Sequence, residues 1–169
     1  MSVPSEAWLR GPIAGMAPIL HPLAYALIQA QEDVERALAG VPADVLWHRR
    51  NGAASAGFHA LHLAGALDRL FTYARGESLT DAQKTAARAE GQDHPTMDAA
   101  ALIEAIRAAV DRAMAQLRAT DTDRLLEPRK VGRAELPATV MGALVHGADH
   151  TARHAGQLVT TIKLLRSPS

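Results

Sequence analysis

The nine prolines of this chain lie at the apparent boundaries of long stretches in which apolar residues recur at helical spacing. Proline is tolerated in the first turn of a helix but breaks a helix interior, so its placement limits where helices begin and end. The composition is rich in alanine and only 4% aromatic, which favours helices over strands. We find no convincing strand and predict an all-α fold.

Four long helices are predicted from the apolar periodicity. Their approximate ranges are 18–40, 54–74, 97–119 and 137–166, with Pro137 opening the last. Two shorter helices are expected at about 43–47 and, behind a Thr80–Gln83 capping box, up to about Ala89. This pattern predicts a four-helix bundle with short extra helices in the connections, in which the second and fourth long helices face each other.

The second long helix contains Gly57 and Gly65. Glycine in a helix interior costs roughly 1 kcal/mol relative to alanine. We therefore expect close packing on a neighbouring helix at both positions.

A chain of 169 residues fits one domain, 1–169, with a lead-in at 1–16 and a tail at 166–169. The 18 basic and 18 acidic residues balance, which disfavours nucleic-acid and anionic-membrane partners. Residues 11–31 lack charged side chains, but three prolines interrupt them, so we predict a buried helix and a cytoplasmic protein. Cysteine is absent, so any sulfur chemistry needs a co-substrate.

Three histidines, His146, His150 and His154, recur every four residues in the last predicted helix. On a helix they advance only about 40° per step and form one nearly axial stripe. Two histidines four residues apart can bind one metal ion, and another helix can supply a third. The second helix offers His59 or His62, and periodicity does not choose between them.

A lone histidine in such a helix is more often hydrogen-bonded or half-exposed than a metal ligand. The concentration of histidines on two helices favours a metal site here. His21, His48 and His94 lie at boundaries or in loops, where we expect solvated side chains. The sequence has no His-Glu-x-x-His protease motif, no Glu-x-x-His di-iron motif and no phosphate-binding glycine loop. Asp68 and Gln157 are near the histidines in sequence and are candidates to orient the imidazoles, or else surface polar groups.

Two segments resemble the DinB/YfiT-like superfamily. They are Phe58-His-Ala-Leu-His62-Leu-Ala-Gly and His150-Thr-Ala-Arg-His154-Ala-Gly-Gln157. Members are four-helix bundles, commonly homodimers, in which one histidine of the second helix and a His-x3-His pair of the last bind a divalent metal. Ala155 stands where the family often has arginine.

Carried over residue by residue, the resemblance implies His62, His150 and His154 as ligands. His59 and His146 are left as neighbours that can support them. The family's characterised members use low-molecular-weight thiols, which implies a thiol S-transferase or a hydrolase-like enzyme acting on a small electrophile. Zinc or nickel suits three imidazoles, and manganese or iron fits the same ligands. The residues that carry out catalysis are unknown at this point.

The competing hypothesis is a non-catalytic helical binding or dimerisation module with a structural or absent metal. It is motivated by Ala/Gly-rich helix faces and by the lack of an obvious general acid or base beside the histidines. A structural zinc site normally closes with four protein ligands, so a fourth histidine would favour this hypothesis.

Overall fold

The computed structural model describes residues 5–166, so parts of the predicted lead-in and tail, 1–4 and 167–169, lie outside the described residues. The long helices are α1 (His21–Leu38), α3 (Ala56–Ala74), α5 (Ala99–Ala119) and α6 (Val140–Arg166). The short helices α2 (Ala43–Trp47) and α4 (Asp81–Ala89) lie in the connections, and single 3₁₀ turns span Ala7–Leu9, Pro18–Leu20 and Thr122–Arg124. The predicted all-α bundle is confirmed.

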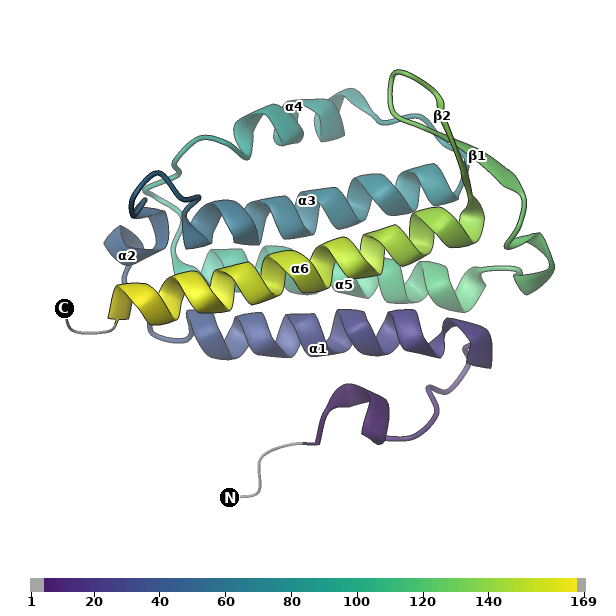
Figure 1. Ribbon diagram of the computed structural model, residues 1–169, viewed down its shortest axis with the longest axis horizontal. Helices are drawn as coiled ribbons and strands as arrows, with labels where there is room; N and C mark the ends of the chain where they lie inside the picture. The colour runs from purple at the N-terminus through teal and green to yellow at the C-terminus, as the bar shows by residue number, and fades with distance from the viewer. Residues whose placement is uncertain (1–4, 167–169) are drawn as a thin grey trace.

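The four long helices form a bundle in which α6 packs between α1 and α3, and α5 packs against α1 and α3 on the opposite side (Figure 1). The second and fourth long helices are therefore neighbours, as predicted. Helix α4 lies over α3, outside the bundle (Figure 1). Fully buried aliphatic side chains from all four helices fill the centre: Leu27, Val34, Leu63, Leu67, Leu102, Ile106, Leu117, Leu144 and Leu158.

Local sequence sets most helix boundaries. The Ser55 hydroxyl caps α3 by accepting a hydrogen bond from the Phe58 amide, and Asp98 caps α5 in the same way. The capping box predicted at Thr80 and Gln83 is present at the start of α4. Gly76, with φ at +81°, follows the last turn of α3.

A two-stranded antiparallel hairpin, β1 (Pro128–Val131) and β2 (Leu136–Thr139), precedes α6. The prediction that the chain has no strand was wrong here, as was the start of the last helix at Pro137. Pro137 lies in β2 opposite Lys130, and α6 begins three residues later. A hairpin of two edge strands tolerates proline because each strand has one side without a partner.

Glycines allow close contacts at three helix positions, and the expected neighbouring helix is found at Gly57, where it is α2. A Cβ at Gly57 would lie 2.6 Å from the Trp47 ring. A Cβ at Gly65 would lie 2.1 Å from the Glu90 carboxylate, so the neighbour there is a side chain beyond α4 rather than another long helix. On α6, a Cβ at Gly147 would lie 2.8 Å from the buried Phe71 ring of α3.

The uncharged stretch 11–31 is buried at Met16 and Leu20 and along the inner face of α1. No helix within residues 5–166 is long and apolar enough to span a membrane. The expectation of a solvated His21 was wrong, because its side chain is buried and its Nε2 lies 3.1 Å from the Met16 carbonyl oxygen. His48 is exposed, and His94 is half-buried with Nε2 at 3.0 Å from the Ala89 carbonyl oxygen.

The contact between Gly147 and Phe71 predicts opposite outcomes for two alanine substitutions on α6. Gly147→Ala should lower the free energy of unfolding, because overpacking costs about 1–3 kcal/mol and exceeds the roughly 1 kcal/mol gained in helix propensity. Gly156→Ala should raise it by up to about 1 kcal/mol, since no atom lies within 4 Å of the added Cβ. Urea unfolding of both variants measures the difference, and equal shifts would contradict the close packing of α3 on α6.

Candidate metal centre

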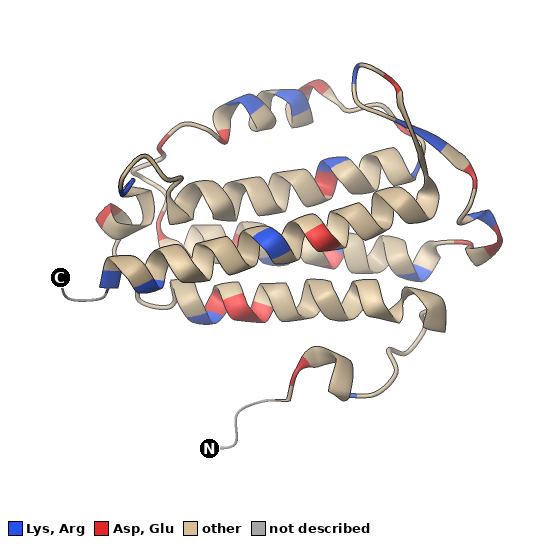
Figure 2. Ribbon diagram, viewed as in Figure 1, with Lys and Arg blue, Asp and Glu red and all other residues tan. Residues whose placement is uncertain are grey.

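The histidines meet where the N-terminal half of α3 packs against the middle of α6. No lysine, arginine, aspartate or glutamate precedes Asp68 on α3, whereas the middle of α6 carries Asp149 and Arg153 (Figure 2). Residues four apart lie on one face of a helix, which brings His150 and His154 to the same side of α6. His62 approaches them from α3 across the helix interface.

His62, His150 and His154 form a compact triangle. Their ring centroids are 4.5 Å apart for His150–His154, 4.6 Å for His62–His154 and 5.0 Å for His62–His150. One nitrogen atom from each ring lies within 4.8 Å of the others, which is a spacing that can hold a metal ion. This cluster of three half-buried histidines is therefore a candidate metal centre.

Two contacts fix the orientation of the His62 ring. Phe58, one turn earlier on α3, stacks on it with the planes 8° apart. Nδ1 of His62 lies 2.8 Å from Oε2 of Glu90, and its Nε2 lies 2.9 Å from Nε2 of His150. An Nδ1–H donated to Glu90 leaves the Nε2 lone pair directed at the other histidines, which is the tautomer that a metal ligand needs.

Glu90 is buried immediately after α4 and is held from two sides. Arg69 of α3 donates hydrogen bonds from both guanidinium NH₂ groups to the two carboxylate oxygens, and His62 provides the third contact. Burial raises the pKa of Glu90, but the hydrogen bonds from His62 and Arg69 together outweigh it and lower the pKa below its usual value. Glu90 therefore remains an anion that accepts from His62 at neutral pH.

Two imidazoles of the cluster, those of His150 and His154, are kept neutral near physiological pH. Burial, followed by repulsion from His62 and neighbouring cations, lowers the pKa of His154 to about 4 and also lowers that of His150. Burial is likewise the main cause of the lowered pKa of His59. Neutral imidazole is the form that donates a lone pair to a metal.

Not every ring nitrogen of the cluster has a hydrogen-bond partner in the protein. Nδ1 of His150 is buried and has no hydrogen-bond partner among the described residues. A contact between two neutral imidazole nitrogens uses one proton and one lone pair, so His62 and His150 satisfy only two of their four ring nitrogens with each other. A group of three imidazoles, one of which has an orphaned nitrogen, fits a divalent ion.

The other predicted site residues occupy different surroundings. His59 is buried, and its Nδ1 lies 3.0 Å from Nδ1 of His154, so it contacts the cluster without joining the group of three. His146 is exposed, with its ring 5.5 Å from that of His150. Gln157 is exposed and lines a cavity of about 690 Å³ together with His59.

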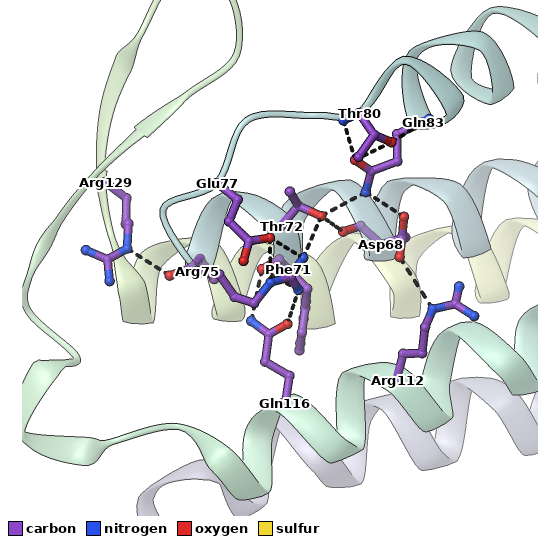
Figure 3. A network of polar contacts seen from close by, with 11 residues as sticks. Asp68, Phe71, Thr72, Arg75, Glu77, Thr80, Gln83, Arg112, Gln116 and Arg129 are labelled. Atoms are coloured by element: carbon purple, nitrogen blue, oxygen red, sulfur yellow. Dashed lines mark hydrogen bonds and ion pairs between the residues drawn. The ribbon is translucent and has the colours of Figure 1, made fainter.

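Asp68 belongs to a polar network that joins α3 to α4 and α5 (Figure 3). Its carboxylate accepts from Gln83 at 2.7 Å and lies 3.5 Å from Arg112 of α5. Asp68 thus anchors α4, and the carboxylate that contacts a histidine of the cluster is Glu90.

Glu90 was not found from the sequence. It lies 28 residues beyond His62, at the end of a short helix that has no buried side chain. The one available signal was Gly65, whose missing Cβ admits the Glu90 carboxylate beside α3.

A cavity of about 480 Å³ opens beside the cluster where α3, α4 and α6 meet. His62 and His150 form part of its wall. A larger cavity of about 1180 Å³ lies between α1 and α6 but contains no histidine, so the smaller one is the relevant access to the candidate metal centre.

Fold and site together define a four-helix bundle with a three-histidine cluster between its second and last long helices. The model of the DinB superfamily matches residues 26–158, and the chain belongs to this superfamily. A conserved protein from Enterococcus faecalis has a similar structure, with a TM-score of 0.73 and 18% identity over 88% of this chain and 98% of that one. A DinB-like protein from Bacillus cereus is also similar, with a TM-score of 0.60 and 13% identity over 86% of this chain and 91% of that one. A comparison with curated proteins returns no match.

The lowered pKa of His154 predicts a pH dependence of stability in the metal-free protein. The unfolded chain takes up a proton at His154 near pH 6.5, but the folded chain does so only near pH 4. The stability contributed by His154 is therefore complete above pH 6.5 and is lost as the pH falls towards 4. Urea unfolding with chelator at several pH values should show a smaller loss for His154→Gln than for wild type. Parallel losses would contradict the burial of a neutral His154.

Proposed function

We propose that the protein is a metal-dependent enzyme in which His62, His150 and His154 hold one divalent ion, zinc or nickel, and a small electrophile is attacked by a low-molecular-weight thiol or by water. The observation that carries this proposal is the triangle of three imidazoles beside a cavity. A divalent ion bound there acts as a Lewis acid that lowers the pKa of a coordinated thiol or water towards neutrality.

The chain's own residues prepare the cluster for this task. Glu90 holds the Nδ1 proton of His62, and Arg69 holds Glu90. Phe58 restricts rotation of the His62 ring by stacking on it. The ligand geometry is thus fixed before any ion or substrate arrives.

The number of protein ligands supports catalysis over a structural role. A closed structural site usually has four protein ligands, whereas a catalytic site keeps positions for substrate. His59 is engaged with Nδ1 of His154 outside the group of three, and His146 is exposed. Three protein ligands leave coordination positions for a co-substrate.

Metal content tests the ligand assignment. Untagged wild-type protein should carry about one divalent ion per chain by elemental analysis. His150→Ala and His154→Ala should lose it, because each removes one of only three ligands. His146→Ala is the matched control on the same helix and should keep the ion. Unchanged metal content in His150→Ala and His154→Ala would refute the site.

Glu90→Gln tests the orientation of His62 separately from the ligand set. Replacing a carboxylate that supports a ligating histidine typically costs about 10–100-fold in metal affinity. A competition titration with a chromophoric chelator measures this loss. An affinity equal to that of wild type would show that Glu90 does not act through His62.

Activity is tested by incubating the metal-loaded protein with a small electrophile and each of several cellular thiols. S-conjugation should disappear on chelation and return when metal is added. His150→Ala should remain inactive under the same reconstitution. Conjugation that persists after complete metal removal would refute the metal-dependent mechanism.

The alternative function, a helical binding or dimerisation module, has one supporting observation. Small residues line the cavity between α1 and α6, among them Ala26, Ala30, Ala152 and Gly156, and permit close approach of another helix. We propose a homodimer on this basis, to be tested by sedimentation of the purified protein. The dimer is compatible with both functions, whereas restored activity after metal addition separates them.

A further inference from the structure

We propose that the cavity beside the histidine cluster binds a small molecule bearing a carboxylate group, and that Arg88 and Lys84 of α4 hold that carboxylate. This inference rests on the proposed function, because it names the substrate class of the same site. It concerns a different wall of the cavity from the metal ligands.

The cavity is asymmetric in charge. Arg69, Lys84 and Arg88 are among its lining residues, and no aspartate or glutamate lines it. Arg69 is already bound by Glu90, so it contributes little net charge. The excess positive charge therefore comes from α4, in a protein whose net charge is zero.

Arg88 has an unused binding capacity. It is exposed, lines the cavity and has no hydrogen bond or ion pair among the described residues. Lys84 lies one helical turn earlier on the same face, and its partner is the fully exposed Asp81, at 3.1 Å. Such a surface pair is weak and can exchange for a ligand anion. A guanidinium is well matched to a planar carboxylate because it donates two parallel hydrogen bonds.

The remaining lining selects against a purely inorganic anion. The lining also includes apolar surface from Leu70 and Tyr73 of α3, Leu79 before α4, and Ala87 of α4. A cavity of about 480 Å³ falls in the size range of small-molecule sites. The preferred ligand thus has an apolar body and one anionic end.

The wall that carries Arg88 and Lys84 is held in place at both ends. Near its start, the Gln83 amide donates to Asp68 at 2.7 Å and to Thr72 at 2.8 Å (Figure 3). Beyond its end, Glu90 is bound by Arg69 and His62. The cationic groups therefore have a defined position relative to the metal ligands rather than lying on a free loop.

The test is a calorimetric titration of the full-length protein, metal-loaded and metal-free, with hexanoate and with its uncharged analogue hexanamide. Hexanoate should bind both forms, and hexanamide should bind at least about tenfold more weakly. Arg88→Gln should weaken hexanoate binding about tenfold, and Arg88→Lys should restore part of the loss. Arg118→Gln, on an exposed arginine of α5 that does not line this cavity, should leave it unchanged.

Absence of hexanoate binding, or equal affinity in wild type and Arg88→Gln, would overturn the inference. Binding that requires the metal and ignores Arg88 would also overturn it, because the carboxylate would then be an ordinary metal ligand. Failure of the proposed function is distinct, since it appears as a missing metal in elemental analysis while hexanoate binding to the metal-free protein is unaffected.

A parallel titration with 6-mercaptohexanoate tells which co-substrate carries the carboxylate. Tighter binding than hexanoate, lost on chelation and in Arg88→Gln, assigns the carboxylate to the thiol. Equal affinity of the two probes assigns it to the electrophile.

Discussion

The close packing of α3 against α6 is the constraint on which the histidine cluster depends. An imidazole is short, so two helices can share one ion only if their backbones come near each other. Gly147 permits this because Phe71 occupies the space of a missing side chain. Leu63, Leu67 and Leu144 bury the remaining interface, and the apolar contact thereby sets the 2.9 Å approach of His62 to His150.

The sequence predicted the helices and the relation of His150 to His154 because both follow from a 3.6-residue period. The sequence did not distinguish His59 from His62 as a metal ligand, and the reason is geometric. Residues three apart on a helix differ by about 60° in direction, so both can face the same neighbour. Indeed His59 contacts His154 and His62 contacts His150. Only the family resemblance distinguished the two, and the cluster of three contains His62.

The sequence analysis missed the hairpin before α6 and the role of Glu90, because neither is marked by a repeating pattern of apolar residues. The hairpin before α6 has four-residue strands that contain two prolines and no buried residue, so its sequence lacks the apolar alternation of a buried sheet. Glu90 reaches His62 through tertiary packing of α4 on α3, which no local pattern encodes. Asp68, nearer to the histidines in sequence, is directed to Gln83 and Arg112 instead.

Helix α4 contributes no buried side chain of its own between Asp81 and Ala89. Its residues can therefore be exchanged during evolution without opening a gap in the bundle core, provided that the anchors at Gln83 and Glu90 are kept. The histidines belong to α3 and α6, whose inner faces form the core and tolerate few changes. Such a division lets the cavity wall formed by α4 vary while the histidine cluster between α3 and α6 is kept.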